Sequence, residues 1–141
     1  MTTLTQSQNR PVSSLFISGL MGWVAALIGA VAVAGLAGLL GVELQIAAPP
    51  NMETAVPLTL APIIFSTLIP AVGATLLFGL LNRFAGKNGV RIFQGIALFF
   101  LLLSLGGPLG LPVAGTVKIF LAAMHIVVGT ALVWALTFGR S

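Results

Sequence analysis

The sequence predicts an all-α fold, an integral membrane bundle of four transmembrane helices, and three observations lead to this prediction. First, 58% of the 141 residues are apolar and only 6% are charged, whereas a soluble domain has about 25% charged residues. Second, the mean hydropathy is +1.16. Third, four apolar segments follow one another, each approaching or exceeding the roughly 20 residues that cross a bilayer. Four spans occupy most of the chain, so we expect a single domain.

Each helix is expected where an apolar segment runs between polar or helix-breaking connections. The expected bounds are, in chain order, 15–40, 57–81, 90–105 and 113–138, between a tail of residues 1–14 and an end of residues 139–141. The second segment contains Pro62 and Pro70, which remove backbone donors and predict a kink. Residues 41–56 and 82–89 are predicted to be polar connections. Residues 106–112 form an apolar connection rich in Gly and Pro, expected at the membrane interface or within it.

The cations predict which way the bundle crosses the membrane. With a cytoplasmic N-terminus, five of the six cations lie on that side, namely Arg10, Arg83, Lys87, Arg91 and Arg140. The opposite side carries one cation and both acidic residues, namely Lys118, Glu43 and Glu53. Cytoplasmic loops of membrane proteins are enriched in Lys and Arg. We therefore predict a multi-pass protein of the bacterial cytoplasmic (inner) membrane with both termini inside.

A secretory signal peptide is the competing interpretation of the first apolar segment. Arg10 precedes that segment, and either Ala30-Val31-Ala32 or Ala32-Val33-Ala34 would serve as an A-x-A cleavage site. However, apolar sequence continues to Leu40, which makes the run longer than the hydrophobic region of a normal signal peptide. We therefore favour a transmembrane helix that is retained.

Small residues recur every four positions in the first expected helix, at Gly22, Ala26, Ala30, Ala34 and Gly38. In lipid, such residues let two helices approach closely and gain dispersion contacts. Packing within the bundle is one interpretation, and an interface with a second copy or a larger complex is the other. We favour packing within the bundle, because a bundle must bury some of its helix faces.

Lys118 and His125 are the ionisable side chains placed well inside an apolar segment. A separation of seven residues puts both on nearly one face of a helix. The simple interpretations are that Lys118 extends to the headgroups and that His125 makes a hydrogen bond within the bundle. The alternative is a polar site near the outer surface, where Glu43 faces Lys118 and His125 lies deeper. Such a site would bind a polar headgroup, a quinone or a proton.

The sequence lacks the residues that most enzymatic reactions and metal sites need. Without cysteine there is no disulfide, thiolate metal site or iron–sulfur cluster. The segment Ala85-Gly86-Lys87-Asn88 lacks the first Gly and the Ser or Thr of a phosphate-binding loop. The pI near 11.6 comes without a basic run, so no nucleic-acid partner is expected. We predict no catalytic residue, no metal and no cofactor, and we favour a non-enzymatic protein.

The order of these features resembles an uncharacterised bacterial family of small four-helix integral membrane proteins, defined as a domain of unknown function. The resemblance covers the chain from about residue 15 onward. It is carried by Ala48-Pro49-Pro50, Arg91-Ile92-Phe93, Leu103-Ser104-Leu105-Gly106-Gly107-Pro108 and Leu121-Ala122-Ala123-Met124-His125-Ile126-Val127-Val128. The resemblance implies the four-span fold and a role for His125, and it implies no reaction or ligand.

Three functions are compatible with these observations, and we favour them in the order given. The first is a non-enzymatic accessory or binding subunit, in a homo-oligomer or a larger membrane complex. The second is transport or proton relay along a polar face that includes Lys118 and His125. The third is a redox protein that binds haem or quinone. A single histidine cannot supply bis-histidine haem ligation within one chain, although a symmetric dimer could.

Overall fold

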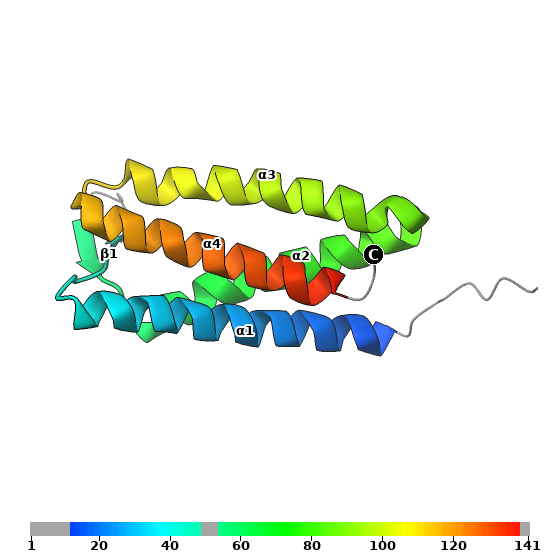
Figure 1. Cartoon of the computed structure of the whole chain (residues 1–141), viewed down its shortest axis with the longest axis horizontal. Helices are drawn as coiled ribbons and strands as arrows, with labels where there is room; N and C mark the ends of the chain where they lie inside the picture. The colour runs from blue at the N-terminus through cyan, green and yellow to red at the C-terminus, as the bar shows by residue number, and fades with distance from the viewer. Residues whose placement is uncertain (1–11, 49–53, 139–141) are drawn as a thin grey trace, which may run out of the picture.

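The computed structural model describes residues 12–48 and 54–138, and it consists of four long helices that run up and down (Figure 1). Their bounds are α1 Val12–Leu39, α2 Leu60–Phe84, α3 Gly89–Gly110 and α4 Gly115–Thr137. All four are long and apolar enough to cross a membrane. The predicted all-α class with four membrane-spanning helices is therefore confirmed.

The helices form a ring in which α1 packs on α2 and α4, while α3 packs on the other sides of the same two helices. The α1–α4 contact is the most extensive of the four. Because neighbouring helices are antiparallel, α1 begins and α4 ends beside the turn between α2 and α3 (Figure 1). We call this end the basic end, and the opposite end the hairpin end.

The core follows the length of the bundle in three clusters of buried side chains. Near the hairpin end, the cluster comprises Ala30, Ala37, Leu44, Ile63, Val117, Leu121 and Met124. The middle cluster comprises Ala26, Ala71 and Leu132, and the cluster near the basic end comprises Phe78, Phe93 and Leu136. The rings of Phe78 and Phe93 meet edge to face, with centroids 4.9 Å apart. Thr67 is the polar side chain buried among the described residues.

A β-hairpin covers one end of the bundle, where the sequence predicts only a linker. Strand β1 (Gln45–Ala48) pairs antiparallel with β2 (Thr54–Pro57), and the amide of Leu58 donates to the carbonyl of Leu44 at 2.8 Å. The strands are four residues each and lack a clear alternation of apolar and polar residues, so periodicity does not reveal them. Buried Leu44 anchors the hairpin in the core.

The α1 helix ends in a Schellman motif that turns the chain into the hairpin. Gly41 has φ +72°, its amide donates to the Gly38 carbonyl at 3.0 Å, and the amide of Val42 donates to the Ala37 carbonyl at 2.9 Å. These bonds satisfy carbonyls that the helix leaves free at its end. Glycine suits the position because a Cβ is disfavoured at positive φ.

The helix bounds differ from the predicted ones mainly at prolines. Pro62 lies in the first turn of α2, where its missing N–H costs no helical hydrogen bond, and Pro70 is the proline inside that helix. The α3 helix continues to Gly110, so most of the predicted connection 106–112 is helical. Pro108 lies in the last turn of that helix, where its missing N–H costs one helical hydrogen bond.

Candidate functional site

Lys118 lies in the first turn of α4, at the hairpin end, and is half-buried. Its Nζ donates to the carbonyl oxygen of Leu109 at 3.0 Å. Leu109 belongs to the last turn of α3, where carbonyls lack helical partners and a cation is favoured by the helix dipole. Lys118 therefore links the ends of α3 and α4.

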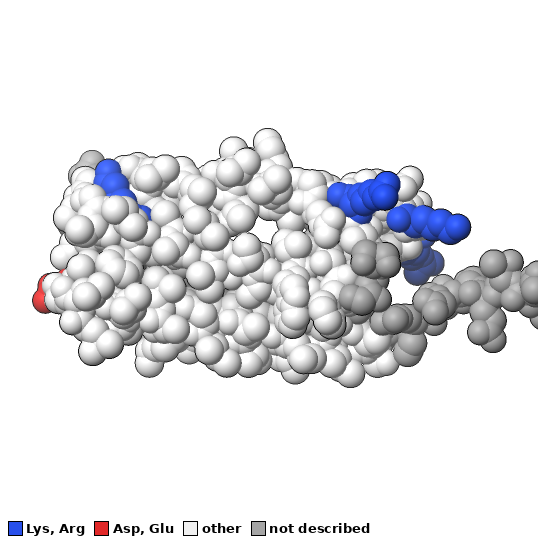
Figure 2. Space-filling model, viewed as in Figure 1, with Lys and Arg blue, Asp and Glu red and all other residues white. Residues whose placement is uncertain are grey.

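Glu43 lies between α1 and β1 and is exposed. It shares the hairpin end of the bundle with Lys118, and Figure 2 shows acidic and basic side chains at that end. Among the described residues, the Lys118 ammonium donates to the Leu109 carbonyl and not to the carboxylate of Glu43. The structure thus places the two charges in the same region without joining them as an ion pair.

His125 lies two turns deeper along α4 and is half-buried. Its Nδ1 lies 2.8 Å from the carbonyl oxygen of Leu121, one turn back in the same helix. Since a carbonyl can only accept, Nδ1 carries the proton, and Nε2 of the neutral ring is an acceptor. One of the two ring nitrogens of His125 is therefore engaged by the helix that carries it.

The face of α4 that carries Lys118 and His125 is turned toward α3. Two contacts fix this orientation: Lys118 reaches Leu109, and a Cβ built on Gly129 would lie 2.9 Å from Cδ1 of Leu101. Ser104 lies one turn from Leu101 along α3, and its hydroxyl donates to the Leu101 carbonyl at 2.7 Å. The predicted polar face is thus a seam between α3 and α4, with its hydroxyl and imidazole bonded to backbone.

The first of the small residues of α1 lie on the face that packs on α4, and the last of them lies outside that face. Gly22, Ala26 and Ala30 are buried, Ala34 packs at the edge of the core, and Gly38 is exposed. A Cβ on Gly22 would lie 3.1 Å from Cβ of Ala135 in α4. A spacing of four advances about 40° per step on a helix of 3.6 residues per turn, so the last position has rotated roughly 160° from the first.

A hydrogen bond between α1 and α2 joins two residues that the sequence did not pair. The indole Nε1 of Trp23 donates to Oγ1 of Thr67 at 3.3 Å, and the Thr67 hydroxyl donates to the Ile63 carbonyl at 2.9 Å. Tryptophan is enriched at the membrane interfaces of transmembrane proteins. Because α1 begins at Val12, Trp23 instead lies three turns inside the bundle.

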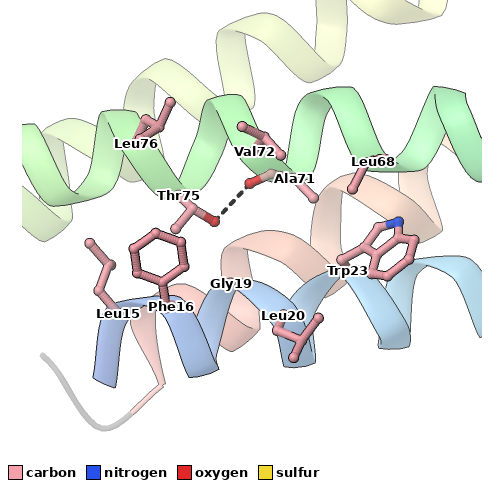
Figure 3. A pocket seen from close by; sticks show the side chains of 10 residues that line it. All are labelled: Leu15, Phe16, Gly19, Leu20, Trp23, Leu68, Ala71, Val72, Thr75 and Leu76. Atoms are coloured by element: carbon pink, nitrogen blue, oxygen red, sulfur yellow. Dashed lines mark hydrogen bonds between the residues drawn. The ribbon is translucent and has the colours of Figure 1, made fainter. Parts of the chain in front are cut away.

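Beside this hydrogen bond, a groove with a cavity of about 200 Å³ lies between α1 and α2. Figure 3 shows side chains of both helices around it. The lining residues are Leu15, Phe16, Gly19, Leu20, Trp23, Leu68, Ala71, Val72, Thr75 and Leu76. The Thr75 hydroxyl donates to the Ala71 carbonyl at 2.7 Å, as the dashed line in Figure 3 marks. The groove therefore presents an almost wholly apolar surface.

The basic end gathers three described cations close in the chain. Arg83 is in the last turn of α2, Lys87 is in the short 3₁₀ helix η1 (Gly86–Asn88), and Arg91 is in the first turn of α3. Figure 2 shows the Lys and Arg side chains gathered at this end, opposite the acidic side chain. Arg10, Arg140 and Glu53 lie outside the described residues.

Comparison with known proteins assigns the chain to a family without assigning a function. Residues 10–140 match the model of a family described as a family of unknown function (DUF6069), and the chain belongs to that family. The resemblance inferred from sequence is therefore confirmed. No curated protein and no solved structure matches the chain.

Proposed function

We propose that this member of the family of unknown function DUF6069 is a non-enzymatic accessory subunit of the bacterial cytoplasmic membrane. It binds a neighbouring transmembrane helix along α3, either in a second copy or in a larger membrane complex. One observation carries the proposal: between Phe93 and Pro108, no described residue of α3 is buried.

The buried residues of α3 lie only near its two ends. Phe93 packs on Phe78 near the basic end, and Pro108 is buried near the hairpin end. The fourth helix, in contrast, has buried residues spaced along its whole length. Between these two ends, α3 exposes large apolar side chains, namely Leu98, Phe99, Phe100, Leu102 and Leu103.

A helix face of this kind suits association with another helix in lipid. Association there comes from van der Waals packing and interhelical hydrogen bonds, because the lipid chains are as apolar as the side chains. The middle of α3 contacts its own bundle on one side, as at Leu101, but buries no residue fully, so a partner helix has packing to add on its exposed side. The exposed amide of Gln94, one turn from Arg91, would supply a hydrogen bond to such a partner.

The engaged polar groups support an accessory role over transport or proton relay. Lys118 and His125 each direct a hydrogen bond to a backbone carbonyl, and neither is paired with the other. A relay along this seam would need these groups to exchange partners, whereas a structural role uses the bonds as they stand. The hydrogen bonds in this seam therefore favour an accessory role.

The orientation in this proposal places the basic end in the cytoplasm. Arg83, Lys87 and Arg91 lie at that end, and α1 begins and α4 ends beside it. An excess of Lys and Arg in short connections favours the cytoplasmic side. Both termini are then cytoplasmic, in agreement with the charge pattern of the sequence.

Crosslinking from α3 in native membranes tests the proposed interface. The chain has no cysteine, so each variant carries a single thiol. The test variant is Phe99→Cys, at a side chain 59% exposed on α3, and the matched control is Ile69→Cys, at a side chain 71% exposed on α2. Each thiol is coupled to a short photoreactive group, the membranes are irradiated, and the products are identified by mass.

We expect one discrete adduct from position 99, a second copy or another membrane protein, and only lipid adducts from position 69. Equal protein adducts from both positions would indicate random encounters. Lipid adducts alone from both positions would likewise contradict an interface along α3.

A further inference from the structure

We propose that the groove between α1 and α2 holds one acyl chain of an anionic phospholipid, whose phosphate binds Arg83 at the basic end. The site is separate from the α3 face, so it does not depend on the accessory role. Three features support it: the apolar lining of the groove, its depth, and the charge at the basic end of the bundle.

The lining of the groove selects hydrocarbon. Its polar atoms are already engaged, since Thr75 donates to the Ala71 carbonyl and the Trp23 indole donates to Thr67. An occupant therefore finds no free side-chain donor in the lining and gains mainly dispersion contacts. A cavity of about 200 Å³ is also too small to hold another helix, which is about 10 Å across with its side chains. A single acyl chain suits both the chemistry and the small volume.

The depth of the groove matches the acyl region of one leaflet. On α2 the lining runs from Leu68 to Leu76, so at 1.5 Å per residue it lies about 10 to 22 Å from Arg83. The hydrocarbon core is about 30 Å thick, and the headgroup layers add several Å on each side. With Arg83 at headgroup level, the groove spans the chains of the leaflet on the basic side.

Arg83 lies on the side of α2 that forms the outer rim of the groove, where Val72 and Leu76 are exposed. It follows Val72 by eleven residues and Leu76 by seven, which on a helix of 3.6 residues per turn leaves it within about 20° of both. A lipid whose chain lies against Val72 and Leu76 therefore has its headgroup beside Arg83. The planar guanidinium donates two parallel hydrogen bonds to a phosphate, which a lysine cannot do.

The charge at the basic end favours an anionic lipid over a zwitterionic one. Arg83, Lys87 and Arg91 lie there, whereas the described acidic side chain, Glu43, is at the hairpin end. A zwitterionic lipid brings its own cation into this cluster, and an anionic lipid does not. One basic residue near the surface increases binding of an anionic lipid about fivefold. We therefore expect a preference of about fivefold for an anionic headgroup.

Fluorescence quenching by brominated lipids measures this preference at the groove itself. Trp23 lines the groove, and the other tryptophan, Trp134, lies on α4, so Trp134→Phe leaves one reporter. The protein is reconstituted in phosphatidylcholine bilayers with increasing fractions of brominated phosphatidylglycerol or brominated phosphatidylcholine. The ratio of the two quenching curves gives the relative affinity. We expect phosphatidylglycerol to quench Trp23 at about one fifth of the fraction that phosphatidylcholine needs.

Two pairs of variants in the Trp134→Phe background distinguish lipid binding in the groove from a general attraction of anionic lipids to the basic end. Arg83→Gln should bring the preference close to one, whereas Arg91→Gln, on α3 and away from the groove, should keep most of it. Val72→Phe fills the groove and should reduce quenching by both lipids, whereas Ile69→Phe, outside the lining, should leave it unchanged. Circular dichroism confirms that each variant is folded. Equal quenching by both lipids in the parent protein would overturn the proposal, as would equal losses in the two arginine variants.

Discussion

The hydrogen bond between Trp23 and Thr67 predicts a measurable energetic coupling between α1 and α2. The indole nitrogen and the hydroxyl oxygen are 3.3 Å apart, at the long end of the range for hydrogen bonds. Thr67 is 2% exposed, and its own proton goes to a carbonyl of its helix. The two perturbations are Trp23→Phe and Thr67→Val, made singly and together.

The expected size follows from the length and the surroundings of this bond. Interhelical hydrogen bonds in membrane proteins average about 0.6 kcal/mol in double-mutant cycles and reach at most about 1.7 kcal/mol. Because the Trp23–Thr67 distance is long, we expect a coupling of about 0.5 kcal/mol, on the lower side of that average. The single Trp23→Phe variant costs more than this coupling because it also leaves part of the indole volume empty.

Reversible unfolding in mixed micelles, followed by far-ultraviolet circular dichroism, gives the free energy of unfolding for the four proteins. The cycle then isolates the pairwise energy from the loss of packing. A coupling within error of zero would show that the indole and the hydroxyl do not bond in the folded protein. A coupling above about 1.7 kcal/mol would show that the two side chains interact through more than one hydrogen bond.

Three further substitutions test the packing of the bundle in the same unfolding assay. Ala26→Leu overfills the middle cluster and should lower the free energy of unfolding by about 1–3 kcal/mol. Ala32→Leu, on the exposed face of α1, should change it little, and equal effects would contradict the packing of α1 on α4. Phe78→Ala, at a fully buried ring, should destabilise the protein by up to about 3–5 kcal/mol. Phe84→Ala, at a ring 76% exposed, should cost far less, and a larger loss from Phe84→Ala would contradict the packing of the cluster near the basic end. Gly41→Ala, at φ +72°, should cost about 1–2 kcal/mol from its left-handed conformation, and an unchanged midpoint would contradict the Schellman motif.

The number and type of the helices could be predicted from sequence because lipid imposes a simple rule. Every backbone polar group in the hydrocarbon must be paired within the protein, so a long apolar segment becomes a helix. Where a helix ends depends on finer chemistry. Pro108 looks like a helix breaker in sequence, yet it lies within the last turn of α3, where it costs the helix one hydrogen bond. The hairpin of Gln45–Ala48 with Thr54–Pro57 depends on pairing between two short segments, which local patterns do not show.

The candidate site was harder to predict because it depends on rotation and neighbours. Lys118 and His125 share a face by spacing, but spacing alone does not say that the face meets α3 or that both groups bond to carbonyls. The spacing of four in α1 suggests one ridge from Gly22 to Gly38, and the rotation of the helix carries Gly38 out of the core. The groove beside Trp23 arises between two helices, so no single segment contains its signal.

The proposed function and the leaflet assigned to the bound lipid both use the proposed transmembrane orientation. One labelling measurement tests this orientation most directly. Thr59 and Asn88 are exposed at the two ends of α2, and in this cysteine-free chain each can be replaced by a single cysteine. Intact spheroplasts are treated with a membrane-impermeant maleimide, before or after permeabilisation. We predict that Thr59→Cys is labelled in intact spheroplasts and that Asn88→Cys is labelled only after permeabilisation. Labelling of both residues in intact spheroplasts, or the reverse pattern, would contradict a bundle that crosses the membrane with its basic end inside.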